Sequence, residues 1–376
     1  MFTAVEKEAR HTAIRQIIEP NDLKALLLIG DTNVGYGFYG DLRYFTNIRT
    51  IFYRHVVVVF PDAEPVLFVG SEISRQAAAR SSFVRDCRSS ENIISSVIEL
   101  LKERGISAGR IGVNFEMLPT AWYIYLKGEL SHIEWVETHE RFMEIRSQRS
   151  QEEADSYRTG ATLGDGGFES ALKVIQSGVT EYEIAAEIEH YARSRGAEEH
   201  FTLLASGKFA FGDGNTIPLV YAPSQRRVEN GDSIMMEITP RYEGYWTQLV
   251  RTVNVGQTNT DLEKIQKVCC EATKKGLEQF KPGKTVKDVV LAMEPYVSSC
   301  GFVLKPPLGH ICGVDLVEGR VALHNEMVLT PGTAVIIHPT IFTPDGRTSF
   351  FWGETYLVTS DGYERLHRTG DELITL

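Results

Sequence analysis

The sequence predicts an α+β protein of two domains, a smaller α/β domain at residues 1–148 and a larger domain at residues 149–376 that repeats a helix–helix–sheet unit. Three observations lead to this prediction. A chain of 376 residues is too long for one ordinary hydrophobic core. Its first part alternates short β-rich runs with helical patterns, and its second part contains an internal repeat.

The first domain is predicted from the alternation of strands and helices. Residues 93–105 (IISSVIELLKERG) place apolar side chains three and four apart, which is the spacing of an amphipathic helix. The runs that read as strands are KALLLIG, RHVVVVF, PVLFVG and RIGVNF. This pattern ends at the highly charged stretch FMEIRSQRSQEEAD, where a long helix is expected to begin. We place the domain boundary there.

The second domain contains two similar segments, residues 178–196 (GVTEYEIAAEIEHYARSRG) and 283–301 (GKTVKDVVLAMEPYVSSCG). In each segment a threonine is followed three residues later by an acid, the capping-box pattern of a helix start. A longer helical pattern precedes each segment, and strand-like sequence follows it. The repeat predicts a duplicated unit with a functional site between its halves.

Composition excludes several classes of function. The formal net charge of -11 argues against a nucleic-acid partner, which requires a basic face. No apolar run approaches the length of a membrane helix, and no signal peptide is visible at the N-terminus. Five scattered cysteines without metal-binding spacing suit a reducing compartment. We therefore expect a cytoplasmic protein with a small-molecule substrate, bound neither to nucleic acid nor to a membrane.

Five polar residues stand in apolar, strand-like surroundings, where an unpaired charge is costly. A predicted hairpin (GDSIMMEITPRYEGYWTQLVRTVNV) carries Glu237 and Gln248, and three later runs carry His310 (PPLGHICGVD), His338 (TAVIIHPTIF) and Glu354 (SFFWGETYLVTSDG). Taken singly, each residue is typical of a satisfied core position. Together, on alternate strands of one duplicated domain, they predict a site in which all five side chains converge in one cavity.

These motifs resemble a known family. Residues 150–376 resemble the pita-bread fold of methionine aminopeptidase, prolidase, aminopeptidase P and creatinase. The preceding part resembles the α/β N-terminal domain that prolidase, aminopeptidase P and creatinase carry. The resemblance implies a homodimer in which the N-terminal domain of one subunit lies near the site of the other.

The resemblance also implies a metal site with altered ligands. The family's two aspartates, eleven residues apart on the first hairpin, fall on Glu237 and Gln248. Its histidine falls on His310, its next glutamate on His338, and its last glutamate on Glu354. Four carboxylates have become two, so a pair of metal ions is not expected. One divalent ion is expected, iron or manganese ahead of zinc, and a metal-free site is the alternative.

Two loops lack the histidines that handle protons in the family's peptidases. The loop ahead of the hairpin has Val220 and Ala222, and the segment after the glycine turn has Val317. The region that supplies the catalytic histidine of creatinase offers Asp213. These absences favour a reaction other than peptide hydrolysis.

Four further residues are predicted to contact substrate. Phe52 and Arg54 match the creatinase segment that contacts a small substrate across the dimer interface, and the arginine would hold a carboxylate. Trp246 and Trp352 are candidates for the pocket wall, although a core position is the alternative for both.

The resulting functional prediction is a non-peptidase enzyme acting on a small carboxylate-bearing amine, amide or guanidino compound, with hydrolysis of a C–N bond as the default reaction. His310, His338, Glu237 and Glu354 are the predicted catalytic residues. One alternative is a mononuclear non-haem iron oxygenase, oxidase or lyase that uses His310, His338 and Glu354. The others are an inactive binding module and an Xaa-Pro peptidase.

Overall fold

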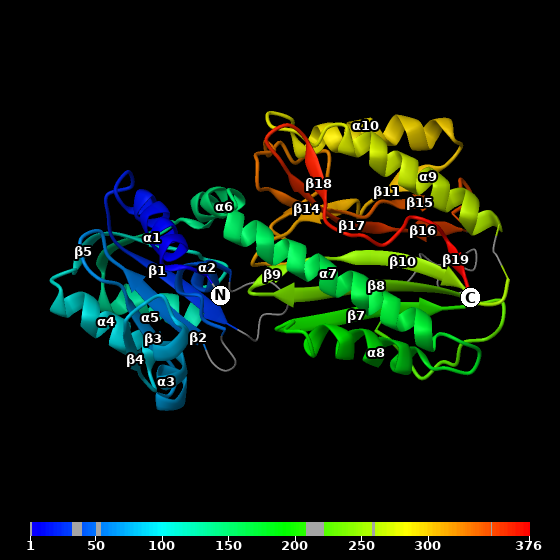
Figure 1. The fold of residues 1–376 in the computed structure, drawn as a ribbon. Coiled ribbons are helices and arrows are strands. Elements are labelled where there is room, and N and C mark those ends of the chain that lie inside the picture. Colours follow the sequence, from blue (N-terminus) through cyan, green and yellow to red (C-terminus); the bar gives the residue numbers. More distant parts are fainter. Residues whose placement is uncertain (1, 32–39, 50–53, 208–221, 258–259, 347) are drawn as a thin grey trace. The chain divides into compact units, whose positions relative to one another are not determined.

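The computed structural model describes residues 2–31, 40–49, 54–207, 222–257, 260–346 and 348–376. The chain divides into two compact units, residues 1–147 and 148–376 (Figure 1). Each unit has β-sheet structure and hydrophobic core residues of its own. No helix among the described residues is both long and apolar enough to cross a membrane.

The N-terminal unit is a mixed α/β layer structure around a six-stranded sheet of order β4-β3-β2-β1-β5-β6. Strands β1 and β2 are antiparallel, whereas β5 runs parallel to both β1 and β6. The strands are β1 (Leu23–Asp31), β2 (Arg54–Val59), β3 (Val66–Val69), β4 (Asp86–Ser89), β5 (Ala108–Val113) and β6 (His132–Glu137). The helices are α1 (Ala4–Ile18), α2 (Gly40–Thr46), α3 (Glu72–Ser81), α4 (Ile93–Glu103), α5 (Thr120–Glu129) and α6 (His139–Ser147).

Two sheets form the frame of the C-terminal unit. The larger has ten strands, with the order β13-β12-β14-β17-β10-β8-β7 along its main path. Its strands are β7 (Glu199–Ser206), β8 (Ser233–Tyr242), β9 (Tyr245–Trp246), β10 (Leu249–Asn254), β12 (Gly309–Ile311), β13 (Gly319–Arg320), β14 (Ala334–Ile337), β17 (Gly353–Val358), β18 (Tyr363–Arg365) and β19 (Ile374–Thr375). The smaller sheet has the order β11-β15-β16, with strands β11 (Val303–Lys305), β15 (Thr340–Phe342) and β16 (Ser349–Phe351).

Two helix pairs cover this frame, one on each half of the larger sheet (Figure 1). Helices α7 (Gln151–Val174) and α8 (Glu181–Arg193) share a core with β8 and β10. Helices α9 (Thr260–Leu277) and α10 (Val286–Ser299) share another core with β14 and β17. The two halves therefore repeat one helix–helix–sheet arrangement, and the predicted fold class is confirmed.

The repeat extends to the backbone at its helix starts. Thr180 and Thr285 each cap a helix in a complete capping box. The threonine side chain accepts from the backbone N–H of the acid three residues later, and the carboxylate of that acid accepts from the threonine backbone N–H. The same two threonines also form isolated antiparallel bridges, Thr180 with Arg227 and Thr285 with Val328. Equivalent threonines thus anchor equivalent helices to the chain segments that lead into each half of the sheet.

Candidate functional site

The C-terminal unit contains a cavity of about 320 Å³ that is lined by residues of both sheets. Four of the five residues predicted to converge are part of its lining, and all four are buried. The lining residues are Leu203, Glu237, Gln248, Lys305, Pro306, Pro307, His310, Leu316, His338, Thr340, Phe342 and Phe351. Lys305, Pro306 and Pro307 are exposed, so they lie at the mouth, whereas the four polar residues form the floor.

Strand pairing explains how Glu237 and Gln248 reach the cavity. Glu237 on β8 lies directly opposite Leu203 on β7 and Val250 on β10. Directly opposed residues of a sheet share a face, and so do residues two apart along a strand. Gln248 therefore points to the same side as Val250 and Glu237. Its backbone N–H donates to Thr355 Oγ1 at 2.9 Å, which fixes the start of β10 against β17.

The two histidines come from neighbouring strands of the other half. His310 lies on β12, and His338 directly follows β14, where its N–H donates to Leu308 O at 3.0 Å. Their ring centroids are 5.3 Å apart. Gly309 allows the backbone of β12 to lie this close to β14, because a Cβ atom at that position would lie 2.1 Å from Ile336 O.

Burial sets the protonation of these groups. Loss of solvation raises the pKa of Glu237 to about 7. It lowers the pKa of His310 to about 4 and that of His338 to about 3, so both imidazoles are neutral at neutral pH. Their Nδ1 atoms are buried without a hydrogen-bond partner in the described part of the chain. The floor thus holds one titrating carboxyl group and two neutral rings.

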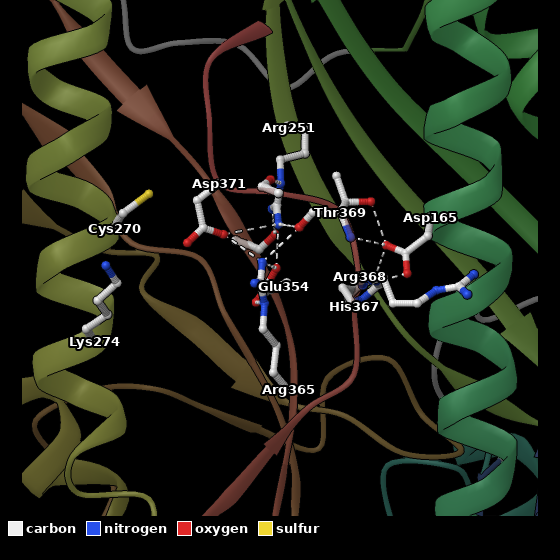
Figure 2. Close-up of polar contacts among 12 residues, drawn as sticks. Asp165, Arg251, Cys270, Lys274, Glu354, Arg365, His367, Arg368, Thr369 and Asp371 are labelled. Atoms are coloured by element: carbon white, nitrogen blue, oxygen red, sulfur yellow. Dashed lines mark hydrogen bonds and ion pairs between the residues drawn. The ribbon is translucent and has the colours of Figure 1, made fainter.

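Glu354 does not join this group, because it lies on the opposite face of the sheet. It is paired with Leu249 on β10 and Ile337 on β14. These two residues are the sequence neighbours of Val250 and His338, which face the cavity, and neighbouring residues of a strand point to opposite faces. Its carboxylate is buried between Arg251 and Arg365 (Figure 2). The predicted convergence of five side chains is therefore not observed: four line the cavity, and Glu354 does not.

The environment of Glu354 is a network of buried charges. Arg365 Nε donates to Glu354 Oε1 at 2.5 Å, and Arg251 Nη2 donates to Glu354 Oε2. Burial alone would raise the pKa of Glu354, but the two guanidinium groups hold it below its ordinary value. Figure 2 shows that the network continues into the C-terminal segment, where Asp371 accepts from Arg365 and Thr369 donates to Asp165 of helix α7. The charge of Glu354 is already compensated by protein cations.

The residue before Glu354 is Gly353, which faces the cavity side opposite Val250. A Cβ atom at Gly353 would lie 2.4 Å from Ile337 O and 2.5 Å from His338 Cβ. The β14–β17 pairing therefore leaves no room for a side chain at this position. As a result, the floor has one carboxylate, one amide and two imidazoles.

The two tryptophans that were predicted to form the pocket wall lie elsewhere in the C-terminal unit. Trp246 is fully buried, with its ring 5.9 Å from that of Phe201, and Trp352 packs under the guanidinium of Arg251 at 4.6 Å. Neither tryptophan lines the cavity. In the N-terminal unit, the guanidinium of Arg54 lies over the ring of Trp122 at 5.7 Å.

Three residues considered from the sequence, Phe52, Asp213 and Val220, lie outside the described residues. Conversely, sequence reasoning missed the cavity mouth. Lys305, Pro306 and Pro307 end three residues before His310 in the sequence. This closeness to a predicted site residue was the signal that could have placed them at the cavity.

Comparison with known proteins identifies the family. Residues 155–360, more than half of the chain, match the model of metallopeptidase family M24. The chain belongs to metallopeptidase family M24. Residues 10–148 match the creatinase/prolidase N-terminal domain, so the predicted family resemblance is confirmed. Membership of M24 implies the use of a divalent metal ion.

Similar proteins include peptidases and a creatinase. The chain is 29% identical to the Xaa-Pro dipeptidase of Pyrococcus horikoshii over 263 aligned residues. The aligned region covers 68% of this chain and 73% of that protein. It is 27% identical over 370 residues to the creatinase of a Bacillus species, covering 92% and 86%. The solved Xaa-Pro dipeptidase from Bacillus anthracis has the same fold, with a TM-score of 0.83 at 23% identity over 98% and 100% of the two chains.

These relatives correct the functional prediction. The expected non-peptidase enzyme is not supported, because M24 is a peptidase family and Xaa-Pro dipeptidases are among the similar proteins. The family and these relatives place the chain among hydrolases of C–N bonds. They give no support to the oxidase or lyase alternative.

The cavity does not reproduce the metal centre that the family implies. Among the described residues, no three acidic, histidine or cysteine side chains are gathered at coordination spacing. Carboxylates that bridge two cations hold such a pair together, and the cavity floor offers one carboxylate, that of Glu237. Gln248 is neutral, and Glu354 is engaged by arginines. The residues present therefore do not fit a pair of metal ions.

We expect Gly353→Ala to destabilise the C-terminal unit, because the added Cβ would collide with the backbone beside His338. Overpacking of this kind costs about 1–3 kcal/mol in the free energy of unfolding, measured by urea denaturation. Gly128→Ala is the matched control, since nothing lies within 4 Å of a Cβ at that helical position. Equal stabilities of the two variants would contradict the packing described here.

We expect the stability difference between the wild type and Glu237→Gln to depend on pH. The folded-state pKa of Glu237 is about 7, above its ordinary value, so folding keeps the proton that the unfolded chain releases near pH 4.5. Wild-type stability should therefore fall relative to Glu237→Gln as the pH rises from 4.5 to 7, by at most about 3 kcal/mol. Denaturation with a chelator present measures this difference, and a constant difference across that range would refute it.

Proposed function

We propose that the protein is a peptidase that hydrolyses the C–N bond of an Xaa-Pro dipeptide. The observation that carries this proposal is the cavity floor, where Glu237 shares one small space with Gln248, His310 and His338 in an M24 fold. A volume of about 320 Å³ is at the small end for ligand sites and suits a short peptide. The Xaa-Pro dipeptidases among its relatives support the choice of substrate.

Glu237 is the group suited to proton transfer. A general acid–base works best when its pKa is near the operating pH, and burial brings the pKa of Glu237 to about 7. Its carboxylate takes a proton from water as the water oxygen adds to the peptide carbonyl carbon. The proton is then returned to the proline nitrogen as the C–N bond breaks, which releases the amino acid and proline.

Gln248 and the histidines are suited to stabilise the carbonyl oxygen. As water adds, that oxygen acquires negative charge, which preorganised N–H donors stabilise in a site of low dielectric constant. The amide of Gln248 has N–H donors, and each neutral imidazole has one N–H. All three side chains are buried on the cavity floor with Glu237.

Oligomeric state and location extend this proposal. We propose a cytoplasmic homodimer, by resemblance to the family and from the cysteine content. The small substrate, without a nucleic-acid or membrane partner, is part of the same proposal. Arg54 keeps the position near the site of the other subunit that the family resemblance implies, which requires that dimer.

We expect purified protein to release proline from alanyl-proline, with kcat rising as the pH increases through about 7 and Glu237 loses its proton. Glu237→Gln removes the proton acceptor and should lower kcat about 10²- to 10⁴-fold. Liquid chromatography of released proline measures both. Glu326→Gln, an exposed glutamate paired with Lys287, is the control and should keep wild-type activity. Full activity in Glu237→Gln, or no hydrolysis by the wild type, would overturn the proposal.

For the metal, we propose at most one ion per chain, iron or manganese ahead of zinc, because the cavity floor offers a single carboxylate to balance the charge of a cation. Elemental analysis of protein purified without chelator, and again after anaerobic incubation with ferrous iron, measures the content. We expect one ion or fewer, lost in His338→Ala. Two ions per chain in the wild type, or one ion that survives in His338→Ala, would contradict this proposal.

A further inference from the structure

The cavity has two walls of different origin. The four polar groups of the floor belong to strands of the ten-stranded sheet or to residues beside them. The facing wall belongs to the three-stranded sheet, where Lys305 lies opposite Thr340, and Thr340 lies opposite Phe351. Phe342 is two residues from Thr340 and shares its face. One face of the small sheet therefore lines the cavity, and Lys305 is the charged residue on it.

The position of Lys305 leaves its charge available to a ligand. It lies on β11, at an edge of the small sheet, and its side chain is exposed at the cavity mouth. Its ammonium lies 4.8 Å from the ring centroid of Phe342, a cation–π contact that directs the side chain along the wall. No carboxylate of the described residues forms an ion pair with it.

We propose that Lys305 binds the C-terminal carboxylate of the peptide and thereby selects substrates with a free carboxylate. This inference rests on the proposed function and names the group that recognises its substrate. A substrate carboxylate on the floor would lie beside Glu237, which carries the same charge when ionised. At the mouth it meets a cation instead, and the peptide bond is left to face the floor.

A lysine on an edge strand also has a purely structural use, because it discourages pairing with another strand. The test must therefore measure something that this use does not change. The preference for a free carboxylate over the corresponding amide is such a quantity, since the two ligands differ by one charge at one end.

The experiment compares alanyl-proline with alanyl-prolinamide in the wild type and in Lys305→Met. A charge-assisted bond of this kind should change kcat/KM for alanyl-proline about 10- to 100-fold, mainly through KM. The amide should be hydrolysed equally by both proteins, and Lys305→Arg should keep the preference for the acid. Lys127→Met is the matched control, because Lys127 makes the same kind of contact, over the ring of Tyr123 at 5.6 Å, without lining the cavity.

A binding measurement separates failure of this inference from failure of the proposed function. Calorimetric titration with proline and with prolinamide needs no turnover. Wild-type preference for proline that disappears in Lys305→Met supports the role of Lys305 even if no dipeptide is hydrolysed. Hydrolysis of alanyl-proline with the same acid-to-amide ratio in the wild type, Lys305→Met and Lys127→Met would overturn it.

Discussion

The C-terminal unit depends on one buried carboxylate, that of Glu354, and on the two arginines that hold it. Removing one partner of a buried ion pair leaves an uncompensated charge, which is strongly destabilising. Arg251 comes from β10 and Arg365 from β18, and Glu354 comes from β17, with which both of these strands pair. Because Arg251 also donates to Gly353 O at 3.0 Å and to Gly370 O at 2.9 Å, the network fixes which face of β17 points toward the cavity. The cavity floor takes its shape from that choice.

Much of the fold could be predicted from the sequence, because its signals are local. The capping boxes at Thr180 and Thr285 depend on residues three positions apart, and the apolar spacing of 93–105 depends on one helix. The convergence of Glu237 and Gln248 was predictable for a similar reason, since a short hairpin fixes the pairing of its own strands. His310 and His338 needed the family resemblance to be placed beside them.

The remainder of the site depends on information that one sequence does not contain. Whether Gly353 or Glu354 faces the cavity is decided by the register of β17 against β10 and β14, and a shift of one residue exchanges the faces. Lys305 looks like an ordinary solvated edge-strand residue until the small sheet is placed against the large one. The functional prediction failed because it weighed missing histidines above the similarity spread through the rest of the chain, which points to peptidases.

The division of the cavity between two sheets has a consequence for how this enzyme can change over evolutionary time. The ten-stranded sheet is bound into the helix pairs and the arginine network, so substitutions there disturb stability together with reactivity. The three-stranded sheet ends in the exposed edge strand β11, whose residue at the cavity mouth contributes little to stability. Descendants of this chain can acquire new substrates through the small sheet while they inherit the reaction unchanged from the large one.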